Sequence, residues 1–195
     1  PYADYPKKLS RQRHEYRGGF LWTHFGCSGP TAMNVSRWVS DLENYRETFL
    51  ELDLFPDEST EELTGWLRTG KGSARNKQLK NFLQAKFSQR LSEAILGLQG
   101  IRESIPMAEV SYHQIGTIVQ SMKSLKLPIH GTRGYPKAEV TAGGVTLSEV
   151  DFQTMESKKC PGLYVAGEVL DLDGPIGGYN FQAAWSTGHT AGLHL

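Results

Sequence analysis

The segment that most constrains the fold is GLYVAGEVLDLDGPIGGYNFQAAWSTGHTAG, residues 162–192. Its apolar start, GLYVAGE, predicts a buried strand, and its end predicts a helix from Gly178 to Leu195. Small residues recur on the apolar face of that helix and would let it lie close to a sheet: Ala184, Gly188 and Gly192. A strand that leads into a helix through a glycine-rich loop is typical of a ligand site, because ligands of open α/β sheets bind at the carboxyl ends of the strands.

Glu168 stands at the end of the predicted strand, and Gly177 and Gly178 stand at the start of the helix. A carboxylate accepts hydrogen bonds from vicinal hydroxyls and repels phosphate, so a sugar or ribityl chain is its better partner. The bare backbone of the two glycines would let a flat ring approach the helix N-terminus, whose N–H groups can stabilise negative charge on that ring. The residues alone leave a second interpretation open, a glycine-rich connection beside a solvated glutamate.

The charge of the chain is balanced, with 21 Lys and Arg against 21 Asp and Glu. This balance supplies no basic field for nucleic acid or an anionic membrane, so we expect neither as a partner. No signal peptide or membrane-spanning stretch is predicted, and two cysteines make no disulfide framework, so we expect a cytoplasmic protein with reduced thiols. The absence of an initiator methionine suggests a chain cut from a longer protein.

The remaining sequence divides into strands followed by helices. HEYRGGFLWTHFG predicts a hairpin that turns at Gly18-Gly19, and Ser28 is a candidate cap of a following helix. Alternation predicts a strand over residues 49–54, and Ser59 with Glu62 has capping-box spacing. Apolar stripes at helical spacing then continue to Leu125, and core packing is their ordinary meaning. Extended, glycine-broken stretches follow, so we place a boundary near residue 127.

Three blocks resemble, in order, those of a bacterial flavoprotein family. LYVAGEVLDLDGPIGGYNFQAAWSTG is similar to its C-terminal FAD signature. WTHFGCSGP, residues 22–30, resembles its THFGxSGP block, and residues 137–168 resemble its VTxGGVxLxEVxxxTMESKxxPGLYxAGE block. The family is that of bacterial NAD(P)/FAD-dependent oxidoreductases, conserved flavoproteins of the aminoacetone-oxidase-like type. The likeness is weaker between residues 40 and 125, where only the helical character matches.

The resemblance implies an α+β fold in which a cap of β-strands and a helical bundle interrupts a Rossmann-type FAD-binding domain. Residues 1–127 would form most of this inserted, substrate-side domain, and residues 128–195 the returning C-terminal part of the FAD-binding domain. The GxGxxG turn of the family has no counterpart here, since GKGSAR at residues 70–75 lacks the third glycine and lies between predicted helices. We therefore expect a partial flavoprotein whose partner is the N-terminal Rossmann segment of the same protein. By itself it would bind FAD weakly or not at all.

The resemblance also implies which residues hold FAD. Glu168, beside Gly167, would contact the ribityl chain. The backbone of three residues would form a wall beside the isoalloxazine ring: Thr141, Gly143 and Gly144. The pyrimidine edge of the ring and the adjoining ribityl would lie along Gly177, Gly178, Tyr179 and Asn180. Bare main chain suits a planar ring, and N–H donors near N1 and O2 would stabilise the charge of the reduced flavin.

His24 and Ser28 are the candidate catalytic residues. His24 could donate to a substrate carbonyl or relay protons, and Ser28 could hold an anionic or carbonyl group at a helix N-terminus. The alternative is a turn in which His24 bonds the backbone and Ser28 only caps. Cys27 has no CxxC partner, which favours a small buried residue over a redox thiol. No His or Cys spacing predicts a metal site.

These observations predict a flavin-dependent oxidoreductase in the full-length protein, with the isolated chain inactive. Hydride would pass from NAD(P)H through FAD to an electron-poor small molecule, such as one with an activated double bond. The alternative is a non-catalytic interaction or substrate-binding module. A flavin enzyme that modifies RNA is a third possibility, which the neutral charge disfavours.

Overall fold

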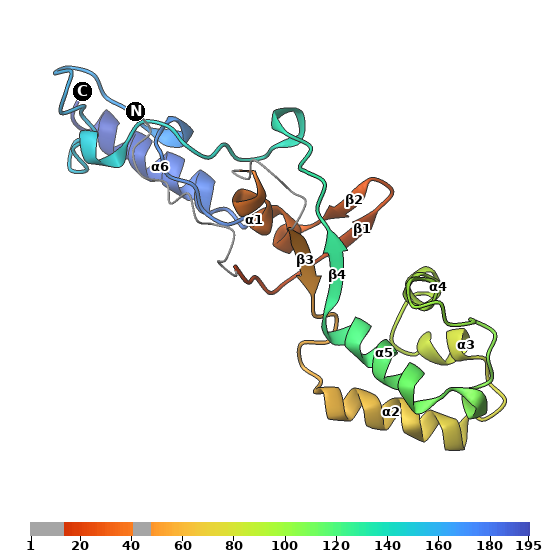
Figure 1. The fold of residues 1–195 in the computed structure, drawn as a ribbon. Helices are drawn as coiled ribbons and strands as arrows, with labels where there is room; N and C mark the ends of the chain where they lie inside the picture. Colours follow the sequence, from red (N-terminus) through yellow and green to blue (C-terminus); the bar gives the residue numbers. More distant parts are fainter. Residues whose placement is uncertain (1–13, 41–47) are drawn as a thin grey trace. The chain divides into compact units, whose positions relative to one another are not determined.

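The computed structural model describes residues 14–40 and 48–195. The chain divides into two compact units, one made of residues 1–45 and 130–195 and the other of residues 46–129. Helices accompany a two-stranded antiparallel sheet in each unit (Figure 1), which confirms the α+β class. The assignment of residues 1–127 to a cap and 128–195 to an FAD-binding domain is a division by role and stays a prediction.

The unit of residues 46–129 is a small helical bundle with a strand pair at its base. Its helices are α2 (Thr60–Ser73), α3 (Leu79–Leu83), α4 (Gln89–Leu98) and α5 (Tyr112–Lys123), with a 3-10 turn at Met107–Glu109. Helices α2 and α5 lie side by side (Figure 1). The predicted apolar stripes form the core, which includes Leu63, Leu67, Leu79, Leu83, Ile95, Ile115, Ile118 and Met122. Full burial of each such side chain stabilises the fold by about 1.5–3 kcal/mol.

Local signals account for the ends of these elements. The Ser59–Glu62 capping box begins α2 as predicted, and a second one, Ser111–Gln114, begins α5. The predicted strand is present as β3 (Phe49–Leu52). It pairs antiparallel with β4 (Leu125–Pro128), so that Leu52 faces Leu125 at one end of the pair.

The unit of residues 1–45 and 130–195 has less regular structure. It contains β1 (Leu21–Thr23), β2 (Gly26–Ser28), α1 (Pro30–Val39) and α6 (Tyr179–Gly192). Three 3-10 turns lie between, at Tyr135–Lys137, Leu147–Glu149 and η5 (Gly167–Val169). A small core gathers around Val150, Met155, Leu170 and Ala191.

The hairpin predicted at Gly18-Gly19 turns elsewhere. Strands β1 and β2 are joined at His24 and Phe25, where the Thr23 hydroxyl donates to the Gly26 carbonyl at 2.8 Å. The Gly19 carbonyl instead accepts from the Thr31 N–H and hydroxyl, so Gly18-Gly19 lies against the start of α1. The cap prediction for Ser28 is also wrong, because Gly29 occupies the N-cap with a φ of 89° and Ser28 pairs with Leu21 in the sheet.

The buried strand predicted for GLYVAGE does not form. This segment folds back on residues 149–158 through single bridges and isolated bonds, such as the Val165 N–H to the Met155 carbonyl at 2.9 Å. Helix α6 forms as predicted, yet its large apolar residues Phe181 and Trp185 are each 69% exposed. The reason for both differences is the same: a buried strand and the apolar face of its helix need a sheet, and the described residues supply none beside them.

Candidate functional site

Glu168 joins two of the predicted cofactor segments. The residue lies in η5, and its Oε1 accepts a hydrogen bond from the backbone N–H of Thr141 at 2.6 Å. The two residues are 27 positions apart in the sequence. A carboxylate is a charged acceptor, so this hydrogen bond links the η5 turn to the segment at Thr141.

Gly143 and Gly144 differ in their surroundings. Val145 and Leu170 form a parallel bridge beside it, with the Val145 N–H donating to the Val169 carbonyl at 2.8 Å. A Cβ on Gly144 would stand 2.4 Å from that same carbonyl oxygen, so no side chain fits there. A Cβ on Gly143 would meet no atom within 4 Å, and its φ of 90° favours glycine. The backbone at Gly143 is therefore open, while Gly144 is required for packing.

Gly167 attaches the η5 turn to α6. Its N–H donates to the Thr187 hydroxyl at 2.9 Å, and a Cβ there would stand 3.8 Å from the Ala184 methyl group. The same helix begins after Gly178, which has a φ of 95° and open space where a Cβ would be. Thus η5 and the glycines at the start of α6 belong to one local arrangement.

Asn180 shapes the loop that precedes α6. Its side-chain Oδ1 accepts from the Gly174 N–H at 2.8 Å, and its Nδ2 donates to the Gly174 carbonyl at 2.9 Å. The neighbouring Tyr179 is 64% exposed, and its ring edge is the nearest group to a Cβ on Gly177, at 3.8 Å. Asn180 thus holds the loop, and a Cβ on Gly178 would meet nothing within 4 Å, whereas the Tyr179 ring lies beside Gly177.

Helix α1 supplies two residues that the sequence analysis did not single out. Asn34 Oδ1 accepts from the Ile176 N–H at 2.7 Å, and Arg37 Nε lies 2.9 Å from Asp173 Oδ2. Both bonds hold the loop before Gly177. Their spacing of three residues could have pointed to them in the sequence. It places two polar side chains on one face of the helix that follows the THFGCSGP block.

The two candidate catalytic residues lie on the β1–β2 hairpin. His24 is exposed at the turn, with its ring edge-on to Phe25 at 5.1 Å, and Arg133 Cζ lies 4.2 Å from the centre of that Phe25 ring. Among the described residues, no hydrogen bond joins the side chain of His24 or Ser28 to the cofactor glycines. The structure therefore brings Thr141, Glu168 and Gly144 together but does not tie His24 or Ser28 to them.

Cys27 is half-buried on β2, and Cys160 is exposed. Burial raises the pKa of the Cys27 thiol because the thiolate loses solvation. A raised pKa lowers the fraction of reactive thiolate at neutral pH, which agrees with a packing role.

A search of protein families matches residues 5–140 to the HI0933-like protein barrel and H2TH domain. The chain belongs to the HI0933-like family. The match spans the β1–β2 hairpin and the whole helical unit. The expected relation to oxidoreductases is thereby confirmed at a coarse level, because relatives of this HI0933-like chain carry enzyme names, one of them a reductase.

Three curated relatives of the HI0933-like chain are similar over most of its length. A ribosomal RNA dihydrouridine synthase of Escherichia coli (strain K12) is 35% identical over 172 residues, which are 88% of this chain and 41% of the relative. The enzyme of the same name from Haemophilus influenzae is 35% identical over 90% of this chain and 41% of its own length. A 3-dehydro-bile acid delta(4,6)-reductase of Clostridium scindens is 33% identical over 91% of this chain and 44% of its length. The chain thus spans about two fifths of these relatives.

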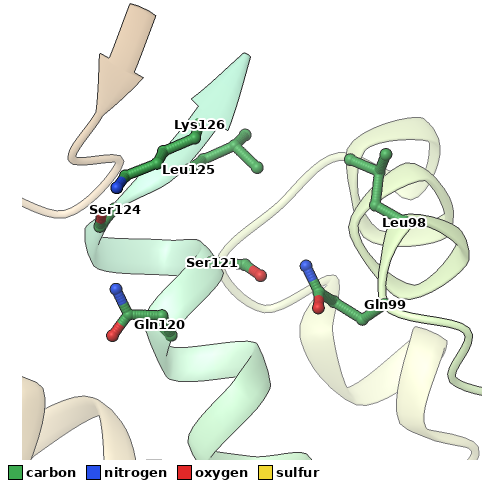
Figure 2. A pocket seen from close by; sticks show the side chains of 7 residues that line it. All are labelled: Leu98, Gln99, Gln120, Ser121, Ser124, Leu125 and Lys126. Carbon is green, nitrogen blue, oxygen red and sulfur yellow. The ribbon is translucent and has the colours of Figure 1, made fainter. Parts of the chain in front are cut away.

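The helical unit contains a pocket of about 350 Å³ between the end of α4 and the end of α5 (Figure 2). Its lining comprises Leu98, Gln99, Gln120, Ser121, Ser124, Leu125 and Lys126. None of these was a predicted site residue. In the described parts of the chain, no group of three or more His, Cys, Asp or Glu side chains is arranged to hold a metal ion, and no helix is long and apolar enough to span a membrane.

Proposed function

We propose that the protein acts as a flavin-dependent oxidoreductase that reduces a carbon–carbon double bond conjugated with a carbonyl group. One observation carries the proposal: the Glu168–Thr141 hydrogen bond unites two predicted cofactor segments while the backbone at Gly143 and Gly178 stays open. Bare main chain beside a carboxylate suits a flat ring attached to a polyol.

The names of the relatives support this substrate chemistry. Dihydrouridine forms when the ring double bond of uridine, conjugated with a carbonyl, takes up two hydrogens. A delta(4,6)-reductase of a 3-dehydro-bile acid acts on double bonds conjugated with a ketone. The two names thus give different substrates that contain the same type of bond. It is an electron-poor double bond, which accepts hydride.

The residues of this chain would have separate roles in binding and catalysis. Glu168 would use the oxygen not bound to Thr141 to accept from ribityl hydroxyls. The open backbone of Gly143 and Gly178 would face the ring, and Asn34 and Arg37 would hold the loop that leads to Gly178. FAD, when bound, would pass to the substrate a hydride that NAD(P)H would have given to it. His24, exposed at its turn, would donate a proton to the substrate carbonyl.

The proposal includes a Rossmann-type FAD-binding domain with two contributors, this chain and an N-terminal segment that carries GxGxxG. The isolated chain would then hold only part of the FAD site. The cytoplasmic location expected from the sequence is part of the same proposal. The non-catalytic module remains the second candidate, because the exposed Phe181 and Trp185 on α6 also suit an interaction surface.

Titration with FAD tests the proposal. The chain alone should bind more weakly than about 1 μM. Together with an N-terminal segment that carries GxGxxG, it should give a yellow complex that absorbs light at about 450 nm. Glu168→Gln should weaken binding in that complex, whereas Glu139→Gln, an exposed glutamate two residues before Thr141, should not. A colourless complex, or equal binding by both variants, would refute the flavin site.

A further inference from the structure

The tip of the β1–β2 hairpin presents an aromatic ring beside two polar side chains. Phe25 is 48% exposed, and the His24 ring meets it edge-on with 5.1 Å between the ring centres. Arg133 lies over the same ring, with its Cζ 4.2 Å from the ring centre. A guanidinium at this distance is attracted to the face of the ring. Phe25 therefore gathers an imidazole and a guanidinium that come from two distant segments of the same unit.

The guanidinium of Arg133 has hydrogen-bonding capacity that the folded chain does not use. Across residues 14–40 and 48–195, no ion pair or hydrogen bond involves this side chain. Arg37 differs, because it pairs with Asp173 at 2.9 Å. A guanidinium carries five N–H donors in a planar fork, and the contact with Phe25 leaves those of Arg133 without an oxygen acceptor. These donors are therefore available to a bound group.

The loop that carries Arg133 has a defined backbone. The Gly134 N–H donates to the Thr132 hydroxyl at 3.4 Å, and the Lys137 N–H donates to the Gly134 carbonyl at 3.1 Å. Gly134 has a φ of 65°, which favours glycine. Arg133 itself is exposed. The turn thus presents this side chain to solvent while Phe25 restricts its motion, which lowers the entropy lost when the guanidinium binds a ligand.

Both segments of this cluster continue into the candidate cofactor site. Arg133 stands eight positions before Thr141, whose N–H donates to Glu168. An extended chain of this length spans at most about 29 Å, and the 3-10 turn at Tyr135–Lys137 shortens the distance. On the other side, β2 leads directly into α1, which holds the loop before Gly177. A substrate bound by the cluster would therefore lie within reach of the proposed flavin.

We propose that Phe25 and Arg133 form a subsite that binds an oxyanion of the substrate, either a carboxylate or a phosphate group. The planar fork of a guanidinium matches two oxygens of such a group. His24 borders the same ring, so the bound oxyanion would lie close to the carbonyl that His24 is proposed to protonate. The inference deepens the proposed function, on which it rests, by specifying the substrate as a conjugated carbonyl compound that carries an acidic group.

A phosphate of the cofactors offers the same chemistry as a phosphate of the substrate. The FAD pyrophosphate has its expected site at the GxGxxG turn of the N-terminal segment. The phosphates of NAD(P)H are the other source. We assign the subsite to the substrate because the proposed proton donor, His24, shares the Phe25 ring with Arg133, and the proton goes to the substrate. NADH therefore enters the experiment as a competitor.

Nuclear magnetic resonance of the chain with isotope-labelled arginine tests the inference without flavin. The Nε–H signal of Arg133, assigned by its loss in Arg133→Lys, should shift saturably when inorganic phosphate or acetate is added at constant ionic strength. A dissociation constant of about 1–10 mM is expected for a single exposed guanidinium. The anion that binds more tightly identifies the acidic group. The signal of Arg37, which is paired with Asp173, should stay in place.

The contribution of the ring is tested by Phe25→Leu, which removes the aromatic face and keeps an apolar side chain. Loss of an exposed cation–π contact should weaken anion binding at Arg133 about two- to fivefold, and Phe25→Tyr should retain it. The matched control is Tyr112→Leu, which removes an exposed ring from beside Arg68 and Lys71, at 5.3 and 5.6 Å, in the other unit. It should leave the affinity at Arg133 unchanged. Circular dichroism should show the same helix content in each variant, since both rings are exposed.

A shift of the Arg133 signal that does not saturate, or equal affinity in Phe25→Leu and the unaltered chain, would overturn the inference. NADH acting at a concentration about tenfold or more below that of phosphate and acetate would also overturn it, since the subsite would then belong to the nicotinamide donor. FAD binding by the two-part complex without anion binding would defeat the inference alone. Anion binding with a complex that takes up no FAD would support the subsite and defeat the proposed function, so the two failures are distinguishable.

Discussion

Arg37 and Asp173, 136 residues apart in the sequence, form an ion pair with Nε 2.9 Å from Oδ2. Their side chains are 18% and 22% exposed, so the pair is mostly shielded from water. Together with the bond from the Ile176 N–H to Asn34, it fastens the loop before Gly177 to α1. The first and last thirds of the chain therefore meet at the candidate site.

Replacing Arg37 with methionine should loosen that loop. The change leaves Asp173 without its partner and should cost about 1–3 kcal/mol, between the values for surface and buried pairs. Hydrogen exchange of a peptide covering residues 173–178 should become faster. Arg102→Met is the matched control, because the pair it breaks with Glu109 is exposed at 68% and 62% and spans 3.6 Å. Unchanged exchange in Arg37→Met would show that the ion pair does not hold the loop.

Two glycines in α2 should respond oppositely to alanine. A Cβ on Gly70 would stand 2.4 Å from Phe82 Cζ and 2.9 Å from Met107 Cε, so Gly70→Ala should lower the free energy of unfolding by about 1–3 kcal/mol. A Cβ on Gly65 would meet nothing within 4 Å, so Gly65→Ala should raise it by up to about 1 kcal/mol. Urea unfolding, followed by circular dichroism at about 222 nm, measures the free energy of unfolding of both variants. Equal shifts in the two variants would contradict the packing at Gly70.

The capping box of α2 should make stability depend on pH. Hydrogen bonds from the Ser59 N–H and hydroxyl lower the pKa of Glu62 below its ordinary value of 4.5. The stabilisation is therefore present above pH 4.5 and is lost as the pH falls through the pKa of the folded state. Glu62→Gln should lower the urea midpoint at neutral pH, and its difference from the unaltered chain should shrink in acid. Glu61→Gln removes the same charge in the same turn, and this variant should keep the loss of stability in acid that the unaltered chain shows.

The two cysteines should differ in reactivity. Burial raises the pKa of Cys27, whereas Cys160 is exposed, so Cys160 should react first with a thiol reagent at neutral pH. Raising the pH should increase the rate at Cys27 because more thiolate forms. Single variants Cys27→Ser and Cys160→Ser assign the two rates in a spectrophotometric thiol assay. Faster reaction at Cys27 would point to an activated thiol rather than a packed one.

Much of the helical unit could be predicted because its signals are local. The capping box at Ser59 and Glu62 and the apolar stripes of α2, α4 and α5 depend on neighbours within a few residues. For the candidate site, the sequence predicted bare backbone at Gly143, Gly144, Gly177 and Gly178. The structure leaves open space beside Gly143 and Gly178, whereas Gly144 packs against the Val169 carbonyl, and the role of these glycines in binding a cofactor stays a prediction. The link between Glu168 and Thr141 and the contribution of Asn34 could not be read from it, because both depend on contacts across many residues.

By itself, then, the sequence indicated the helices of the helical unit, the Ser59–Glu62 cap of α2 and a resemblance to a flavoprotein family. Only the tertiary structure decided that the hairpin turns at His24, that β3 pairs with β4, that α1 holds the loop before Gly177, and that Tyr112 stands among cations. The physical reason is range: helix periodicity and capping act within one or two turns. Strand pairing, ion pairs and surface charge depend on which distant segments the folded chain brings together.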